Sequence, residues 1–390
     1  MFSSKLNNNL IYELPYDNTV GYYKEKKKIY KRNIELNKVL NTHKNKIDDI
    51  YSENPNLWDE IKKFSNEYEF IYTNYLDTFK NISNIFPISR SYFKLWEVLH
   101  DFKLITFSPD EKFVSCHLAE GPGGFIECIY KFINKYITTD FSNITIYGST
   151  LISKHSSVPK WKIKKNIQNN YNIILNNSST ENGDLYCIDQ VEKLINKIGC
   201  NTCNFVTADG GFDFSNNYNN QENNFINLLI SEIYITLKLL KNNGNALIKI
   251  YDIYSRNSIK VLYIISLLFE KIYIIKPLTS RPANSEKYIL CNKFNKNSKY
   301  EFFLNILKEI IITKKLHYLN NDDIIVQYKF IEKILNYNKW YTKRQISYIN
   351  KTIYYINKYK NNNDINYLNN LYKNNKKNCI EWCKTYNLRF

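Results

Sequence analysis

The hydrophobic positions between residues 80 and 296 switch repeatedly between short apolar runs and segments in which apolar residues recur every three or four positions. The short runs predict strands at 113–119, 144–148, 204–208, 245–251, 271–276 and 287–292. The helical spacing predicts helices at 125–139, 222–241 and 255–270. Strands that alternate with helices are typical of an α/β sheet covered by helices on both faces, so we expect a Rossmann-like fold.

The two ends of the chain have a different pattern. The N-terminal residues carry charge-rich helical patterns at 24–51 and 57–79. The C-terminal residues contain no glycine, are rich in Tyr, and between 301 and 390 hold 16 Lys and Arg against 7 Asp and Glu. We therefore expect a helical N-terminal extension at 1–75, an α/β domain at 76–296 and a basic, Tyr-rich helical C-terminal extension at 297–390.

The net charge of +17 suits a polyanionic partner such as nucleic acid. The chain is also crowded with Asn, Ile, Tyr and Lys, which an AT-rich coding sequence produces whatever the function, so the charge supports nucleic-acid binding without establishing it. Eight cysteines in 390 residues do not form a disulfide framework, and the N-terminus has no signal-peptide pattern. We expect a cytoplasmic, reducing location. The longest apolar run, 261–277, contains Glu270 and Lys271 and is too short and too charged to cross a membrane.

The segment 117–125, His-Leu-Ala-Glu-Gly-Pro-Gly-Gly-Phe, joins a predicted strand to a predicted helix through glycines. Glycine lets a backbone approach a ligand closely, and the unpaired N–H groups of the following helix point back at the turn. A dinucleotide fingerprint would need a third glycine where Ile126 stands, and a phosphate loop would need Gly-Lys-Ser/Thr. S-adenosylmethionine is the remaining common occupant, and we expect its amino-acid end to lie at this turn.

Reactive side chains occur where ligands are expected in an open α/β sheet, beyond the carboxyl ends of the strands. Asp209 follows a strand in Ala-Asp-Gly-Gly, and Lys249 interrupts an apolar strand. Glu286 ends the segment 280–286, Ser-Arg-Pro-Ala-Asn-Ser-Glu, and Lys94 lies upstream in Ser-Arg-Ser-Tyr-Phe-Lys-Leu. Singly, each has an ordinary explanation as a turn cap, a lysine reaching toward solvent or a surface charge.

Together, these motifs resemble the FtsJ-type RNA 2′-O-ribose methyltransferases, which include the cap-ribose enzymes and versions carried by large cytoplasmic DNA viruses. The resemblance covers residues 80–296 and includes the family's Gly-Pro-Gly-Gly-Phe turn. It implies a catalytic tetrad of Lys94, Asp209, Lys249 and Glu286. It also implies S-adenosyl-L-methionine as cofactor, and we assign its contacts to Glu120, Gly121, Pro122, Gly123, Gly124, Phe125, Asp184 and Asp209.

Two cofactor contacts depart from the family pattern. Asp184 matches the adenine-contacting acid only through a short Gly-Asp fragment, and an ordinary turn explains that fragment equally well. The strand 144–148 runs into Gly148-Ser149-Thr150, where many Rossmann-like folds place an acid that holds the ribose. The residue that contacts the cofactor ribose is therefore unassigned.

The tetrad has a physical rationale. A ribose 2′-hydroxyl is a poor nucleophile until its proton is removed, and a lysine can accept that proton only when neutral. Burial and a nearby second ammonium both lower a lysine's pKa from about 10.4. We therefore hypothesise that Lys249 is the general base, that Lys94 supplies like charge, and that Asp209 and Glu286 orient the two ammonium groups.

The resemblance implies methyl transfer to the first nucleotides of capped mRNA. Ribosomal or transfer RNA is an alternative substrate, and a catalytically silent methyltransferase fold that binds RNA is an alternative of another class. RNA would contact Lys160, Lys162, Lys164 and Lys165, or the aromatic and basic C-terminal segment with Trp340, Tyr341, Lys343, Arg344, Tyr348, Tyr354, Tyr355, Lys358 and Tyr359. For most of those tyrosines, packing against the domain is the simpler expectation.

The cysteine pairs Cys200/Cys203 and Cys379/Cys383 would have to converge to form a tetrahedral zinc site, but the first adjoins a predicted strand and the second lies near the far terminus. We therefore expect scattered buried thiols and no metal. The terminal extensions are the expected contact surface for any protein partner, and a viral member of the family would also be open to packaging in the virion.

Overall fold

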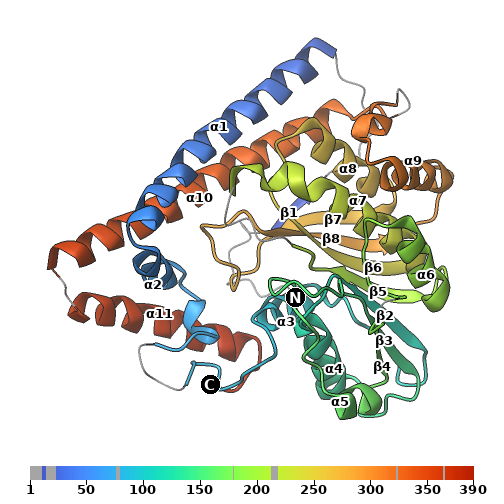
Figure 1. Cartoon of the computed structure of the whole chain (residues 1–390), viewed down its shortest axis with the longest axis horizontal. Helices are drawn as coiled ribbons and strands as arrows, with labels where there is room; N and C mark the ends of the chain where they lie inside the picture. The colour runs from blue at the N-terminus through green and yellow to red at the C-terminus, as the bar shows by residue number, and fades with distance from the viewer. Residues whose placement is uncertain are drawn as a thin grey trace.

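The computed structural model describes residues 11–14, 23–75, 80–178, 180–211, 218–321, 324–362 and 365–390. Within these residues eight strands form one sheet in the order β1-β7-β8-β6-β5-β2-β3-β4 (Figure 1). The strands are β1 (Ile11–Leu14), β2 (Phe113–Leu118), β3 (Ile144–Gly148), β4 (Ile173–Leu175), β5 (Cys203–Ala208), β6 (Leu240–Ile250), β7 (Phe269–Ile275) and β8 (Lys287–Phe294).

The strands β2 to β6 pair in parallel, so their carboxyl ends meet at one edge of the sheet. β8 lies antiparallel between β6 and β7, and β1 adds an antiparallel edge beside β7. Because β8 runs opposite to β6, the start of β8 lies at the same edge as the end of β6. This arrangement brings segments that are distant in sequence to a single edge.

Helices cover both faces of the sheet. The helices of the central region are α3 (Ser91–Phe102), α4 (Gly124–Tyr136), α5 (Lys165–Asn170), α6 (Ile188–Ile198), α7 (Gln221–Leu239), α8 (Arg256–Ser266) and α9 (Tyr300–Thr313). In Figure 1, α3 and α4 lie on one side of the sheet and α7 and α8 on the other. Successive side chains of a strand point to opposite faces of the sheet. Phe205 of β5 therefore packs in the buried cluster with α3 and α4, whereas the next residue, Val206, packs in the cluster with α7 and α8.

The extensions contribute α1 (Tyr23–Glu53), α2 (Pro55–Ser65), α10 (Tyr328–Asn362) and α11 (Ile365–Thr385), with short 3₁₀ turns at Glu69–Ile71 and Leu316–Asn320. A further 3₁₀ turn at Tyr218–Asn220 belongs to the central region. Figure 1 shows α1 and α10 side by side next to the end of the sheet that holds β1, β7 and β8. Tyr341 of α10 is buried in one core cluster, and Trp382 of α11 is buried in the other beside Phe93. The hydrophobic core therefore continues from the sheet into both extensions.

The predicted α/β fold with helices on both faces is confirmed. The predicted strand 144–148 matches β3, and the strand expected at 245–251 begins earlier, at Leu240, where a register shift against β5 accommodates the extra residues. The sequence analysis missed β4, which has three residues, and α6, in which only Val191, Ile195 and Ile198 are buried. Elements this short or this polar give little periodic signal.

Residues 11–14, which lie in the N-terminal extension ahead of its predicted helical segments, form strand β1 in the sheet. Four residues cannot display a strand period, so the signal was absent from the sequence. The helix expected at 57–79 ends at Ser65, and turns follow to residue 75, while residues 76–79 lie outside the described residues. None of the described helices combines the length and apolar character that crossing a membrane requires.

Candidate active site

The glycine turn that follows β2 leads into α4 at the edge of the sheet where the carboxyl ends of the parallel strands meet. Gly123 has φ +116°, a conformation that L side chains rarely adopt. A Cβ at Gly121 would lie 2.5 Å from the Pro159 carbonyl oxygen, and one at Gly124 would lie 2.2 Å from the Ser91 hydroxyl. Gly121 and Gly124 therefore allow other parts of the protein to pack closely against the turn. From the sequence, we expected them to make room for a ligand.

Glu120 occupies the start of this turn. Its side chain is buried, and its Oε1 accepts a hydrogen bond from the Phe125 backbone N–H at the first turn of α4. Its Oε2 is buried and has no hydrogen-bond partner in the described structure. Burial, together with the nearby Asp209 carboxylate, raises the pKa of Glu120 well above its usual value. A partnerless buried carboxylate oxygen of this kind is suited to a ligand that donates hydrogen bonds or carries positive charge.

The four predicted tetrad residues come together at this edge as two ion pairs. Lys94 of α3 places its Nζ 2.7 Å from Oε1 of Glu286, the residue before β8. Lys249 of β6 places its Nζ 3.2 Å from Oδ1 of Asp209, and it also donates to the Asp209 backbone carbonyl at 2.8 Å. The side chains of Lys94, Lys249 and Glu286 are buried, and Asp209 is partly exposed.

Tyr288, which the sequence analysis missed, joins the two pairs. It lies opposite Lys249 in the β6–β8 ladder, so both side chains project from the same face of the sheet. Its hydroxyl donates to Asp209 Oδ1 at 2.9 Å and accepts from Lys94 Nζ at 3.5 Å. The sequence signal was available, because a tyrosine two residues after Glu286 in a buried strand needs a partner for its hydroxyl.

The two lysines differ in their electrostatics. Burial lowers the pKa of Lys94, and the attraction of Glu286 offsets only part of that effect. Burial also acts to lower the pKa of Lys249, but Asp209, Tyr251 and Glu286 together outweigh it, so the pKa of Lys249 is raised. The expectation that burial and Lys94 lower the pKa of Lys249 is therefore wrong for the protein without ligands. Glu286, which Lys94 and Lys249 face, has a lowered pKa despite its burial.

A fourth carboxyl group, Glu232 of α7, lies beneath the turn that follows Asp209. Its side chain is fully buried, and the Gly210 backbone N–H acts to lower its pKa, but no side chain in the described structure donates a hydrogen bond to it. A Cβ at Gly210 would lie 2.2 Å from its Oε1, so this glycine makes room for the carboxyl. Burial, reinforced by Asp209 and opposed by Lys249, raises the pKa of Glu232 to about 8. An acidic residue in the apolar run 228–235 was the sequence signal that could have found it.

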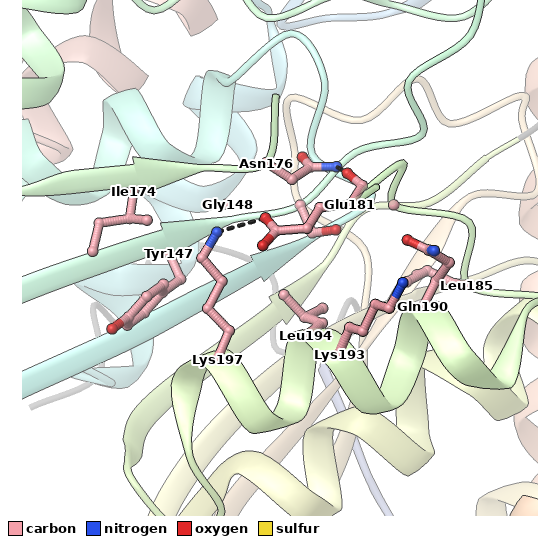
Figure 2. A pocket seen from close by; sticks show the side chains of 12 residues that line it. Tyr147, Gly148, Ile174, Asn176, Glu181, Leu185, Gln190, Lys193, Leu194 and Lys197 are labelled. Carbon is pink, nitrogen blue, oxygen red and sulfur yellow. Dashed lines mark hydrogen bonds and ion pairs between the residues drawn. The ribbon is translucent and has the colours of Figure 1, made fainter. Parts of the chain in front are cut away.

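The predicted adenine contact Asp184 forms a local turn, in which its Oδ1 accepts from the Tyr186 backbone N–H at 2.9 Å. Its neighbours Gly183 and Leu185 line a small cavity, with about 20 Å³ of space open to water, between the ends of β3 and β4 and helix α6. Figure 2 shows the Lys197 ammonium and the Glu181 carboxylate meeting at this cavity, 2.6 Å apart. The segment around Asp184 thus lies beside the edge of the sheet, while the Asp184 carboxylate accepts a hydrogen bond from the backbone of its own turn.

The other predicted surfaces differ in their exposure. The lysines at 160, 162, 164 and 165 are all exposed, and the Lys162 backbone N–H donates to the Pro122 carbonyl of the glycine turn at 3.0 Å. Among the C-terminal tyrosines, Tyr341 is buried and Tyr354 is 55% exposed. Cys379 and Cys383 are buried in α11, Cys203 is buried in β5, and Cys200 is exposed. In the described part of the chain, no group of three or more His, Cys, Asp or Glu residues is placed to hold a metal ion.

Comparisons with known proteins identify the same region. The family model described as FtsJ-like methyltransferase matches residues 87–294, more than half of the chain. A Caenorhabditis elegans relative named "Cap-specific mRNA (nucleoside-2'-O-)-methyltransferase 1" is 28% identical over 261 residues, which cover 62% of this chain and 27% of the relative.

Two further relatives bear on the function. A protein of Autographa californica nuclear polyhedrosis virus named "Cap-specific mRNA (nucleoside-2'-O-)-methyltransferase" is 33% identical over 165 residues, covering 40% of this chain and 60% of the viral protein. A Caenorhabditis briggsae relative named "Inactive cap-specific mRNA (nucleoside-2'-O-)-methyltransferase 1B" is 28% identical over 262 residues, covering 62% of this chain and 29% of the relative. The chain thus spans less than a third of each nematode protein.

Proposed function

The chain belongs to the FtsJ-like methyltransferase family, and on that premise we propose that it is an S-adenosyl-L-methionine-dependent RNA 2′-O-ribose methyltransferase. Its proposed substrate is the ribose of the first nucleotides of capped mRNA, because relatives named as cap-specific mRNA methyltransferases are similar to this chain. The observation that carries the proposal is the meeting of the Lys94–Glu286 and Lys249–Asp209 pairs beside the glycine turn.

The residues present fit the proposed cofactor. S-adenosyl-L-methionine supplies a methyl group on a positively charged sulfonium. The glycine-turn side of the site holds three carboxyl groups, Glu120, Asp209 and Glu232, against the single ammonium of Lys249. The partnerless Oε2 of Glu120 is a buried acceptor at the end of the turn where the amino-acid part of the cofactor is expected. In this proposal Glu120 and the turn 121–125 hold the cofactor, and Asp209 lies between it and Lys249.

In the proposed reaction, Lys249 accepts the proton of the 2′-hydroxyl, and Lys94 and Tyr288 hold the substrate oxygen in place. Lys249 must lose its own proton first, and Asp209 opposes that loss. Both ammonium groups lose protons more easily beside a positively charged cofactor, because like charges disfavour the charged form. Glu286 fixes the position of the Lys94 ammonium at 2.7 Å. Much of the rate should come from holding the reactants in line.

Transfer of tritiated methyl groups to capped and uncapped RNA of one sequence, followed by nuclease mapping, tests the proposal. We expect label on a ribose near the cap, and Lys249→Ala should abolish transfer while the Kd for S-adenosylmethionine stays within about twofold. Lys293→Ala, which removes a lysine of β8 that is 54% exposed, is the matched control. Label on a base nitrogen, or turnover retained by Lys249→Ala, would contradict the proposal.

A catalytically silent RNA-binding subunit is the second candidate, because one relative with the same share of identical residues carries the word inactive in its name. Here all four tetrad side chains are present and paired, which favours the active form. The two candidates separate in one experiment, since a silent subunit would bind RNA and transfer no label to any RNA supplied.

A further inference from the structure

The loop between β7 and β8 carries Glu286 and, through it, positions the Lys94 ammonium. Part of its support comes from within the matched domain. Ser280 Oγ donates to Glu286 Oε1 at 2.7 Å, and Lys276 Nζ donates to the Glu286 carbonyl at 2.6 Å. The Glu97 carboxylate of α3 accepts from the Leu278 backbone N–H at 2.6 Å. Lys276 Nζ also donates to the Asn284 carbonyl at 3.1 Å and to its Oδ1 at 2.7 Å, so the matched domain holds the two ends of the loop and contributes to its middle.

The middle of the loop is held by helix α10, which lies outside the matched region. The Tyr341 hydroxyl donates to the Asn284 carbonyl at 2.8 Å. The Gln345 side-chain amide donates to the Ala283 carbonyl at 2.9 Å and to the Ser285 hydroxyl at 3.3 Å. Both side chains are buried, with Gln345 1% exposed and Tyr341 2% exposed, so water does not compete for these bonds.

Helix α1 of the N-terminal extension supports the same residues through Asp252. Lys44 of α1 lies 2.9 Å from the Asp252 carboxylate, which also accepts from the Ser285 hydroxyl at 2.9 Å and pairs with Lys287 at 3.1 Å. Lys287 follows Glu286 directly, and its ammonium lies 3.9 Å from the centre of the Tyr341 ring. Consecutive residues on both sides of Glu286 are thus fixed by side chains of the two extensions.

The segment before α3 adds two contacts on the far side of the loop. The fully buried Glu69 pairs with Arg281 through both of its carboxylate oxygens. The Tyr72 hydroxyl donates to the Thr279 carbonyl at 3.1 Å. Loops without such anchors sample many conformations, and a displacement of about 1 Å at a catalytic group costs rate because the reacting atoms lose alignment.

We propose that the helical extensions are positioning elements of the active site, and that Tyr341 and Gln345 of α10 are positioning residues that hold the loop 277–286 so that Glu286 aligns Lys94. This inference rests on the proposed function for its catalytic consequence, whereas its structural part stands independently. It predicts that substituting Tyr341 or Gln345, which lie outside the tetrad, slows the chemical step and leaves RNA affinity unchanged.

The test compares Tyr341→Phe, Gln345→Ala and the double variant in the full chain. Tyr341→Phe keeps the ring against Lys287 and removes only the hydroxyl. Tyr51→Phe, which changes a tyrosine of α1 that is 43% exposed, and Asn350→Ala, which removes an exposed amide from α10, are the matched controls. Hydrogen–deuterium exchange of the amides at 277–287 gives a measurement that requires no enzymatic activity.

We expect the double variant to exchange these amides roughly tenfold faster or more, because its loop is no longer held by the buried hydrogen bonds from α10. We expect kcat to fall roughly tenfold, with KM for RNA within about twofold and both controls unchanged. Unchanged exchange in the double variant would overturn the proposal, as would a loss confined to RNA affinity, since that result would make α10 a substrate-binding surface. If the wild-type protein transfers no methyl group, the exchange data still decide whether α10 holds the loop, and only the proposed function fails.

Discussion

Replacing Glu232 with Gln should change how stability depends on pH. Glu232 is fully buried and its pKa is raised from 4.5 to about 8, chiefly by burial. Between these values the folded protein keeps the proton that the unfolded chain releases, so the folded state binds more protons and the free energy of unfolding falls as pH rises. The loss is about 1.4 kcal/mol per pH unit, or about 2.7 kcal/mol from pH 5.5 to 7.5. The Gln amide does not titrate, so the variant should escape this loss.

Thermal unfolding of the wild type and Glu232→Gln across pH 5.5 to 8.5 measures the effect. For a chain of 390 residues, a difference of about 2.7 kcal/mol corresponds to roughly 3 °C in Tm, with the variant gaining on the wild type as pH rises. Glu332→Gln, which removes an exposed carboxylate from α10, is the control and should give a curve parallel to that of the wild type. Parallel curves for Glu232→Gln as well would refute the reasoning, because they would mean that Glu232 is already ionised in the folded protein at pH 5.5.

Three further outcomes follow from interactions elsewhere in the chain. Gly183→Ala should lower Tm by several degrees in a thermal scan, because φ is +70° and the new Cβ would lie 2.0 Å from a backbone carbonyl oxygen. Glu69→Gln should lower the free energy of unfolding in urea at pH 7 by about 3 kcal/mol, because Arg281 outweighs burial and lowers the pKa of Glu69 from 4.5 to about 2. This stabilisation is present above pH 4.5 and is lost as pH falls toward 2. Alanine at the four exposed lysines of the segment 160–165 should flatten the salt dependence of RNA affinity, by about 0.7 to 0.9 in the log–log slope for each phosphate that is no longer neutralised by a lysine.

Much of the fold could be predicted because long buried strands and amphipathic helices leave periodic patterns. β3 and β5 were placed within one residue, and the four residues of the proposed tetrad could be grouped because each stands in a recognisable motif of the family. The strand β1 could not be predicted, because its four residues pair with residues of β7 that lie far away in the sequence. Pairing between distant segments leaves no local pattern.

The electrostatics of the site were the least predictable part. The resemblance to the family placed Lys94 and Lys249 in one site, but the direction of each pKa depends on the balance between burial and all the surrounding charges. Asp209 lies 3.2 Å from Lys249 and raises its pKa, while burial prevails at Lys94. Glu232 escaped prediction for a related reason, since a charged residue in an apolar helix is usually assigned to the solvent face until the structure shows the turn above it.

The charges of the site divide into two sides, and this division bears on how Lys249 can lose its proton. On the glycine-turn side, burial together with Asp209 raises the pKa of both Glu120 and Glu232, so these carboxyls are unfavourable as anions without a further cation. On the loop side, burial and neighbouring cations lower the pKa of Lys94 and Lys276. A cation on the first side would let the carboxyls ionise, and an anion on the second would stabilise the ammonium groups.

The proposed cofactor is positively charged and matches the glycine-turn side. The backbone of the proposed RNA substrate is negatively charged and matches the loop side. The same cation would bring positive charge close to Lys249 and so work against the effect of Asp209. Under the proposed function, the raised pKa of Lys249 in the ligand-free protein would keep its amine protonated until the cationic cofactor is bound. The proton acceptor would then be generated only in the complex that is able to transfer the methyl group.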